Sequence, residues 1–320
     1  MKNNVHFNKM FDAIKNAHYI LVVTHKNPDL DTLSSGLALS NYFFDNRIKH
    51  KVFNIDCNLP RKLDFLSKFE KISSVLPKFY DLIIYVDCAN EDRVGITFEN
   101  NIKTISIDHH HTNTNFADIN IVDEEKGSTA ELLYYFYKCN NIKISRKVAE
   151  CLYVGIYDDS LAFTTPRTTI NTFSAVSDLL SSKIDVSFIS ESLKNRESLA
   201  KFKAISKIMT TLDLQNEGKV ATVYLEDTWT KETGVIVNEC DDIVDSVLSI
   251  GIVKIVAYFR IVDNKIRVSL RSKGEIDVSV IASKYNGGGH RNSSGFSFDS
   301  LDIFDTKEKV VATILDYIEY

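Results

Sequence analysis

The chain has 320 residues, 44% of them hydrophobic and 25% charged, with a formal net charge of −5; this supplies enough apolar material for two globular domains. No long basic run is present, which argues against long duplex nucleic acid as a partner and favours a small phosphorylated substrate. Five cysteines without a Cys-x-x-Cys pair exclude the disulfide framework of a small secreted protein.

The first half of the chain alternates helical spacing with short apolar runs. In chain order these predict a helix at 7–17, a strand at 19–24, a helix at 31–44, strands at 51–55, 81–86 and 103–107, and helices at 128–137 and 145–157. Asp31 is predicted as the N-cap of the second helix. The apolar run at 19–23 is too short for a signal peptide or a membrane span, so a cytoplasmic protein without a membrane partner is expected. Continuous apolar strands between helices predict an α/β fold, a parallel sheet with helices on both faces.

The second half has a different pattern. Residues 181–212 have amphipathic helical spacing and no strand, and we expect them to form a helical connector between a domain at 1–180 and one at 213–320. The second domain is expected to be smaller and mixed α/β. Its predicted elements are strands at 220–225, 253–261 and 265–271, a short helix at 277–284 and a closing helix at 304–318. Asp263-Asn264 is a turn pair between two of these strands.

Acidic and histidine residues follow three of the predicted strands directly. They are His25, Asp29 and Asp31 after the first strand, Asp87 after 81–86, and Asp108, His109 and His110 after 103–107. Because the carboxyl ends of parallel strands share one edge of a sheet, these side chains are expected to converge. Asp159, at the end of the helix that starts near 145, is a further acidic candidate; spacing alone does not choose between it and Asp158.

Four carboxylates in one pocket require neutralisation. Like charges ~4 Å apart repel by about 4 kcal/mol per pair at an effective dielectric near 20. Two divalent cations would cancel the four charges, and imidazole ligands alongside carboxylates, without cysteine, favour Mn²⁺ or Fe²⁺. We therefore expect two divalent cations, Mn²⁺ being favoured, bridged by Asp87. His110 is then free to contact a phosphoryl group, and Asp108 to orient its neighbours.

Each of these residues also has a structural interpretation. Asp31 alone could be a helix cap, Asp87 could simply end a strand, and 108–110 could be a solvated loop. The functional interpretation is favoured because three strand ends carry the same chemistry together. In the second half, the glycines at 287–289 would let a backbone approach a phosphate, with Arg271 and His290 as further donors; the alternative is a flexible turn.

These motifs resemble those of the DHH phosphoesterase superfamily. Its pattern His-x-x-x-Asp-x-Asp is matched at 25–31, its Asp-His-His triplet at 108–110, and its Gly-Ile-x-x-Asp motif at 155–159, which selects Asp159 over Asp158. The segments 268–272 and 287–296 resemble a strand and the glycine-rich motif of the companion substrate-binding domain. The resemblance covers about residues 15–315 and is greatest to the oligoribonuclease and pAp-phosphatase branch. Three departures from the family pattern remove no ligand; they are Leu30, Ser34 and Ser293-Ser294.

The resemblance implies both a site and an activity. One metal ion would be held by His25, Asp29 and Asp87, and the other by Asp31, Asp87, His109 and Asp159. Asp108 and His110 would serve in catalysis, and a second domain that closes over the cleft would bind substrate through Arg271, Ser272, Gly287, Gly288, Gly289 and His290. The implied activity is Mn-dependent hydrolysis of short oligoribonucleotides to mononucleotides, with pAp as a second substrate; a homodimer is left open.

Several rival functions use similar residues. A phosphodiesterase for linear or cyclic dinucleotides could use the same site. A manganese pyrophosphatase is disfavoured by the Gly-Gly-Gly-His motif, and a RecJ-type exonuclease would usually carry a further nucleic-acid-binding domain. The alternative outside enzymology is a nucleotide-sensing module with a dead metal site, and it is disfavoured because every expected ligand is present.

Overall fold

The computed structural model describes residues 4–98, 101–194 and 197–318; residues 195–196, within the stretch expected to be a connector, lie outside the described residues. The chain divides into two compact units, Met1–Arg196 and Glu197–Tyr320. The boundary between the units falls inside the expected connector, 181–212, and the helices on either side of the boundary belong to the two units. Helix α6 (Val186–Lys194) packs into the core of the first unit, and α7 (Leu199–Thr210) into a core of the second.

The first unit is built on a five-stranded sheet whose strands are all parallel, in the order β2-β1-β3-β4-β5. The strands are β1 (Ile20–Thr24), β2 (His50–Phe53), β3 (Leu82–Val86), β4 (Lys103–Asp108) and β5 (Ile119–Val122). Every residue of β1 and β3 is buried, as continuous apolar runs predict for central parallel strands. The expected α/β fold with a parallel sheet is confirmed. The short edge strand β5, only half buried, was not anticipated.

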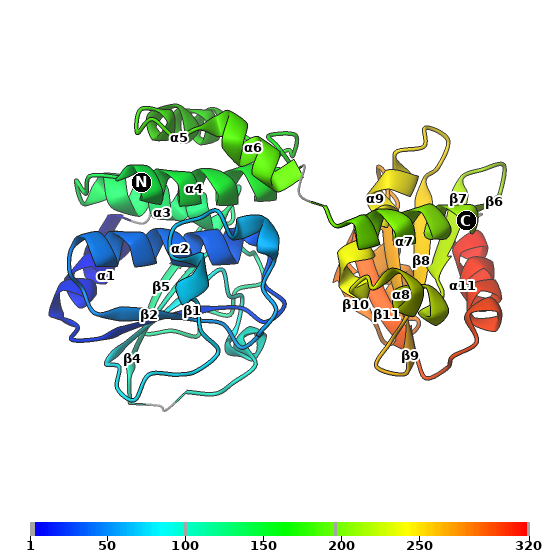
Figure 1. Ribbon diagram of the computed structural model, residues 1–320, viewed down its shortest axis with the longest axis horizontal. Coiled ribbons are helices and arrows are strands. Elements are labelled where there is room, and N and C mark those ends of the chain that lie inside the picture. Colours follow the sequence, from blue (N-terminus) through cyan, green and yellow to red (C-terminus); the bar gives the residue numbers. More distant parts are fainter. Residues whose placement is uncertain (1–3, 99–100, 195–196, 319–320) are drawn as a thin grey trace. The chain divides into compact units, whose positions relative to one another are not determined.

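Helices cover one face of this sheet (Figure 1). Against the strands lie α1 (Asn4–Asn16), α2 (Leu30–Asp45) and α3 (Thr129–Cys139). Helix α4 (Arg146–Asp159) packs on α2 and α3, and α5 (Ile170–Leu180) packs on α4. In the described residues the other face is covered by a 3₁₀ turn, η3 (Glu91–Val94), and by loop side chains such as Phe98 and Phe116. The prediction of helices on both faces is therefore wrong for this face, because β3 and β4 are joined by a loop without an α-helix.

The start of α2 differs by two residues from the prediction. The N-cap is Asp29, whose carboxylate accepts a hydrogen bond of 3.0 Å from the backbone N–H of Thr32. Asp31, predicted as the cap, lies in the first turn and is fully buried. Its carboxylate does not cap α2 and instead accepts backbone N–H groups of another helix, as described below.

The second unit contains a six-stranded sheet in the order β10-β11-β9-β8-β7-β6, in which only the β7–β8 pair is parallel. The strands are β6 (Asp213–Gln215), β7 (Val220–Leu225), β8 (Ile255–Val262), β9 (Lys265–Ser272), β10 (Gly288–His290) and β11 (Ser293–Phe298). The expected mixed α/β architecture is confirmed. Asp263 and Asn264 both have positive φ, as a two-residue hairpin turn requires.

Helices cover both faces of this second sheet. On one side lie α7, α8 (Asp227–Thr233), the 3₁₀ turn η4 (Val237–Cys240) and α9 (Ile243–Leu248). On the other lie α10 (Val278–Ser283) and α11 (Ile303–Ile318). Among the described helices of the whole chain, none combines the length and the apolar character that a membrane span needs.

Candidate active site

The strand order of the first sheet defines where a site forms. The chain runs from β1 outward to β2 and then crosses back to β3, so the topological switch point lies between the carboxyl ends of β1 and β3. His25 follows β1, Asp87 follows β3, and Asp108 ends β4. The predicted residues therefore lie at the position where this topology places ligands.

Asp87 lies at the centre of the cluster. Its backbone has φ +60°, a left-handed conformation that Asp tolerates better than most residues and that often marks functional sites. Its buried carboxylate has Oδ2 3.6 Å from Nε2 of His25 and Oδ1 3.6 Å from Nε2 of His109. Two ligand atoms about 2.1 Å from the same ion lie roughly 3–3.5 Å apart. The two 3.6 Å separations are slightly above this range, so a small side-chain shift would let each oxygen of Asp87 share an ion with a different imidazole.

Three groups of possible ligands have their ligating atoms within 4.8 Å of one another in the described part of the chain. They are His25, Asp29 and Asp87; Asp31, His109 and Asp159; and Asp87, His109 and His110. Together the groups contain all six residues predicted to bind metal, and none includes a cysteine. A donor set of carboxylates and imidazoles fits divalent cations of the Mn²⁺ or Fe²⁺ type.

Both central imidazoles are oriented by backbone carbonyls. His25 Nδ1 lies 2.9 Å from the carbonyl oxygen of Lys26, and His109 Nδ1 lies 3.3 Å from that of Lys126. With the proton on Nδ1 in each ring, Nε2 faces the carboxylates: His25 toward Asp29 at 3.3 Å, His109 toward Asp159 at 3.0 Å. This tautomer leaves Nε2 available as a metal ligand.

The carboxylates of the cluster need compensating positive charge. Burial lowers the pKa of His25, but the carboxylates of Asp29 and Asp87 outweigh it and raise this pKa to about 10. The pKa of His109 is likewise raised to about 10 by Asp159 and Asp87 against the effect of burial. Burial and then the charge of Asp87 raise the pKa of Asp31 well above its usual range. Without cations, the cluster can be neutralised only by taking up protons.

The two neighbouring carboxylates at the end of α4 have different environments. Asp159 contacts His109, and burial raises its pKa despite that contact. Burial, together with the charges of Asp29 and Asp159, raises the pKa of Asp158 to about 7. Only Asp159 belongs to a group of ligating atoms.

Asp108 is turned inward from the pocket. It is fully buried; its Oδ1 accepts hydrogen bonds from the backbone N–H of His109 at 2.8 Å and from Nδ1 of His110 at 2.7 Å. Its Oδ2 accepts from the Asn113 amide at 2.6 Å. Asp108 thus orients the two histidines, and both of its oxygens are engaged by protein groups. The ring of His110 is partly exposed, with Nε2 left for another partner.

Some side chains that shape the site escaped the sequence analysis. Thr129 donates its hydroxyl to Asp87, Ser35 donates to Asp31, and Asn113 supports Asp108. One signal was available: Ser128 and Glu131 have the Ser-x-x-Glu spacing that marks a helix start, and Ser128 does cap α3. The spacing predicts a helix at that point but not what its first turn contacts.

In the second unit, Arg271, Ser293 and His290 are directly opposite one another across β9, β11 and β10, so they share one face of the sheet. Gly289 has φ +142°, and a Cβ there would lie 2.5 Å from the carbonyl oxygen of Ser293. A Cβ on Gly288 would meet nothing within 4 Å. The predicted glycine-rich segment is thus an edge strand with open space beside it.

The structure does not bring Ser272 to that face. It is buried on the opposite side of β9 from Arg271. Its hydroxyl donates to the carbonyl oxygen of Ile276 at 2.7 Å and accepts from the Asn292 amide at 3.0 Å. These bonds hold Ser272 in the interior beside the glycine-rich segment, away from the surface.

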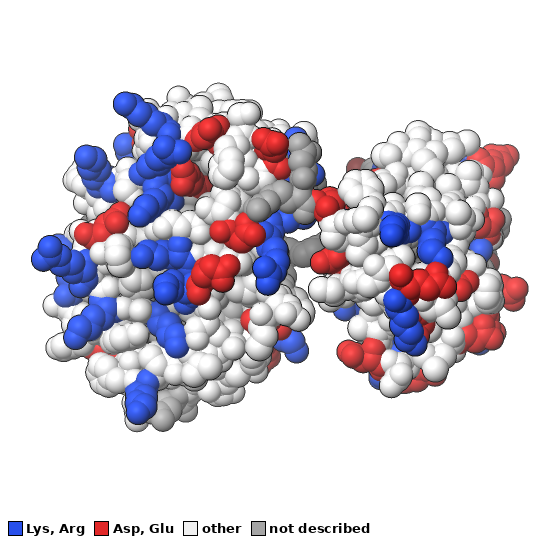
Figure 2. Space-filling model, viewed as in Figure 1, with Lys and Arg blue, Asp and Glu red and all other residues white. Residues whose placement is uncertain are grey.

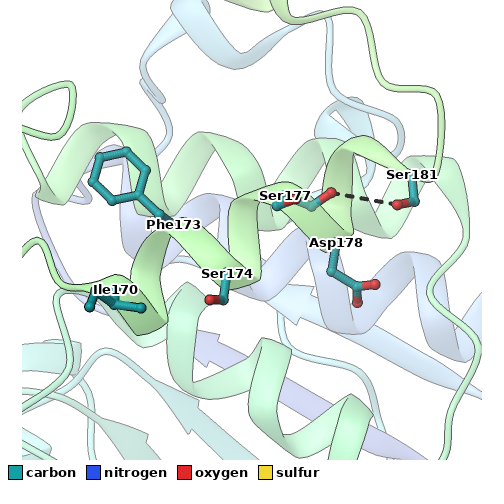
Figure 3. Close-up of a pocket in the computed structure, with 6 residues that line it drawn as sticks. All are labelled: Ile170, Phe173, Ser174, Ser177, Asp178 and Ser181. Atoms are coloured by element: carbon teal, nitrogen blue, oxygen red, sulfur yellow. Dashed lines mark hydrogen bonds between the residues drawn. The ribbon is translucent and has the colours of Figure 1, made fainter.

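A separate hollow of about 520 Å³ lies along the exposed side of α5 (Figure 3). It is lined by Ile170, Phe173, Ser174, Ser177, Asp178 and Ser181. Its one carboxylate is already paired, because Asp178 accepts from Lys138 at 3.0 Å and from the Tyr134 hydroxyl at 3.1 Å. None of the predicted site residues lines this hollow, so we do not assign it to the chemistry.

Comparison with known families finds a match for each of the two units. Residues 19–156 match the N-terminal domain of the DHH family, and residues 217–319 match the DHHA1 domain. The chain belongs to the DHH family, and the family predicted from its motifs is confirmed. The first match ends three residues before Asp159, and the second contains the whole glycine-rich segment.

Named relatives match the chain nearly end to end. It is 30% identical to the probable bifunctional oligoribonuclease and PAP phosphatase NrnA of Streptococcus mutans, covering 92% of this chain and 94% of that protein. It is 28% identical to the bifunctional oligoribonuclease and PAP phosphatase NrnA of Bacillus subtilis, covering 89% and 91%. The cyclic-di-AMP phosphodiesterase PdeA of Listeria monocytogenes is 24% identical, with 96% of this chain and 49% of that protein covered.

A solved structure shares the fold over almost its full length. An exopolyphosphatase-related protein from Bacteroides fragilis superposes with a TM-score of 0.87 at 24% identity, covering 98% of this chain and 96% of that one. At 24% identity this similarity establishes the fold only, and the reaction has to be inferred from the site.

Proposed function

We propose that this chain is a Mn²⁺-dependent phosphoesterase that hydrolyses short oligoribonucleotides to mononucleotides and removes the 3′-phosphate of pAp. The observation that carries the proposal is the Asp87 carboxylate, which faces His25 with one oxygen and His109 with the other. A carboxylate shared between two ions would hold them as close together as the two-metal mechanism of phosphoryl hydrolases needs. The named relatives that match end to end support the choice of substrate.

The metal assignment follows from the ligand groups. We assign His25, Asp29 and Asp87 to one ion, and Asp31, His109 and Asp159 to the other. Asp87 is added to the second set because its Oδ1 lies 3.6 Å from Nε2 of His109. The two imidazoles keep Nε2 available because their Nδ1 atoms are held by backbone carbonyls. When bound, two divalent cations acidify a water to hydroxide at neutral pH and neutralise the phosphoryl oxygens.

His110 is assigned to the phosphoryl group. Burial lowers its pKa, but the hydrogen bond to Asp108 and the charge of Asp87 outweigh this and raise the pKa. The hydrogen bond from Nδ1 to Asp108 favours the protonated ring, which presents Nε2–H as a donor. A donor aimed at a developing negative charge contributes to stabilising the transition state.

The second unit is assigned to the rest of the substrate. Arg271 and His290 provide cationic or donor groups on one face of its sheet, beside the open backbone at Gly288. On the surface visible in Figure 2, basic side chains are interspersed with acidic ones on both units. With a net charge of −5, this distribution favours a substrate with few phosphates over a long polyanion.

A second candidate function is hydrolysis of linear or cyclic dinucleotides. The similarity to a cyclic-di-AMP phosphodiesterase favours it, although the chain spans about half of that protein. The same metal cluster would serve either reaction, so the substrate decides between them.

The experiment is a substrate panel with the metal-stripped full-length chain. The substrates are RNAs of two, five and twenty nucleotides, pAp, pGpG, cyclic di-AMP and pyrophosphate, each with Mn²⁺, with Mg²⁺ and with EDTA. We expect Mn²⁺-dependent turnover of the two- and five-nucleotide RNAs and of pAp, and slow turnover of the twenty-nucleotide RNA. Turnover of cyclic di-AMP alone would move the function to the second candidate. Equal rates in EDTA would refute the metal-dependent proposal.

A further inference from the structure

Thr129 contacts two carboxylates of the proposed metal site at once. Its hydroxyl donates a 2.8 Å hydrogen bond to Oδ1 of Asp87, and its backbone N–H donates a 2.7 Å bond to Oδ2 of Asp31. The next backbone N–H, of Ala130, donates to Oδ1 of Asp31 at 3.1 Å. Thr129 is itself completely buried. The first turn of α3 therefore ties together acidic residues that come from α2 and from the end of β3.

These bonds determine which oxygen lone pairs remain available. Oδ1 of Asp31 accepts from Ala130 and also from the Ser35 hydroxyl at 3.2 Å, which occupies both of its lone pairs. Oδ2 of Asp31 accepts only from Thr129 among the bonds of the described residues, so it keeps one lone pair. Oδ1 of Asp87 accepts the Thr129 hydroxyl with one lone pair. Its other lone pair remains available on the side where His109 lies.

The Thr129 hydroxyl has no role in capping the helix. Ser128 is the N-cap of α3, and its side chain accepts the N–H of Glu131 at 3.0 Å. The amide groups of Thr129 and Ala130 need an acceptor in any helix, and Asp31 provides it. The hydroxyl, in contrast, could be replaced by a methyl group without exposing an unpaired backbone group. Its bond to Asp87 is therefore an addition specific to the site.

We propose that Thr129 is a positioning residue for metal binding, which holds the Asp87 and Asp31 carboxylates in the orientation that two divalent cations require before either ion binds. A hydrogen bond to a ligand carboxylate restricts the rotation of that carboxylate and directs its remaining lone pair to the ion. This inference rests on the proposed metal site and is independent of which substrate the chain cleaves.

The test compares variants of the metal-stripped full-length chain by calorimetric titration with Mn²⁺, without substrate. Thr129→Val removes the hydroxyl and keeps the shape, and we expect at least one Mn²⁺ to bind about 10- to 100-fold more weakly. Thr129→Ser keeps the donor and should bind within about threefold of wild type. Thr129→Ala removes both the hydroxyl and the γ-methyl group, and it serves as the comparison if the valine variant does not fold.

The matched control is Thr172→Val. Thr172 is almost as buried as Thr129, and its hydroxyl donates to the Glu131 carboxylate at 2.9 Å. The same hydroxyl also accepts the backbone N–H of Thr169 at 3.2 Å, so Thr172→Val removes one hydrogen bond more than Thr129→Val, and neither Glu131 nor Thr169 is a proposed ligand. This variant should lose the same kind of hydrogen bond and keep wild-type affinity for Mn²⁺. Wild-type affinity in Thr129→Val, equal weakening in Thr172→Val, or failure of Thr129→Ser to retain binding would each overturn the positioning role. A wild-type chain that binds no Mn²⁺ would instead overturn the proposed function, and the inference with it.

Discussion

Gly155 of α4 lies directly against the Asp31 carboxylate of α2. A Cβ built on Gly155 would overlap Oδ1 of Asp31, and it would lie 2.6 Å from Cβ of Ala130 and 2.7 Å from Oγ of Ser34. All of these groups are buried in the packing of α4 against α2 and α3. Because Gly155 has no side chain, the Asp31 carboxylate fits between α2 and α4.

The substitution Gly155→Ala should damage the site more than the fold. The methyl group has to displace Asp31 or push α4 away, which costs about 1–3 kcal/mol of unfolding free energy. A displacement of about 1 Å in a ligand lowers turnover roughly 100-fold. Turnover with Mn²⁺ and urea unfolding in EDTA measure the two effects. Gly251→Ala is the control, because a Cβ there meets nothing within 4 Å; equal turnover in both variants would contradict the argument.

The substitution Asp87→Asn should abolish turnover. An amide keeps the size of the side chain but replaces one ligating oxygen by a nitrogen and removes the charge shared between His25 and His109. We expect a loss of at least about 1,000-fold, with a circular dichroism spectrum like that of wild type. The bound Mn²⁺ should fall below two ions per chain. Asp178→Asn, on α5, should retain full activity; near-normal turnover in a folded Asp87→Asn chain would remove Asp87 from the bridging role.

His50 predicts a pH dependence of stability that is separate from the metal cluster. Burial lowers its pKa below the usual 6.5, and its Nδ1 and Nε2 are engaged with the Ile48 carbonyl and the Ser40 hydroxyl, each at 2.8 Å. A group whose pKa is lower in the folded state stabilises the fold fully above its unfolded pKa. That stabilisation is lost as pH falls from about 6.5 through the folded value.

The measurement is urea unfolding in EDTA at pH 7.5, 6.5 and 5.5 for wild type and His50→Gln. Histidines of the metal cluster titrate in both proteins and cancel in the difference. Wild type should be the more stable at pH 7.5, and its advantage should shrink toward pH 5.5. A difference that stays constant over this range would show that His50 does not titrate as expected.

The turn after α4 should be stabilised by Ala162→Gly. Leu161, Ala162 and Phe163 all have positive φ, between 47° and 68°, a conformation in which a Cβ clashes with the backbone. Removing the Cβ of Ala162 should raise the unfolding free energy by about 1 kcal/mol. The same substitution at Ala13, inside α1, should lower it by a similar amount or more, since glycine disfavours a helix. The same sign at both positions would contradict the conformational argument.

Arg271→Gln tests the assigned face of the second unit. Loss of a charge-assisted bond to a phosphate should raise KM for a five-nucleotide RNA about tenfold or more. The effect on kcat should be smaller, because Arg271 is assigned to binding and not to the metal site. Arg291→Gln is a suitable control, since Arg291 is paired with Glu275. An unchanged KM in Arg271→Gln would place substrate binding elsewhere.

The strand ends show which parts of the fold and the site the sequence patterns predict. Apolar runs identify β1, β3 and β4, and because parallel strands end at one edge, the polar residues after them had to converge. The short strands β5 and β10 lack such runs, since an edge strand of three or four residues buries little. The N-cap was misassigned because Asp29 and Asp31 are equally suitable by type. Asp29 caps α2, while the Asp31 carboxylate instead accepts the first backbone amides of α3.

Patterns along the chain predict the fold class, the second mixed domain and the chemistry of the cluster, because hydrophobic periodicity and residue type act locally. Three further features become visible only in the folded chain: Thr129 supports Asp87, Gly155 leaves room for Asp31, and Ser272 faces away from Arg271. The physical reason is that hydrogen bonds and steric contacts depend on angstrom-scale distances between segments far apart in the chain. Thr129 and Asp87, for example, are 42 residues apart and joined by a single 2.8 Å bond.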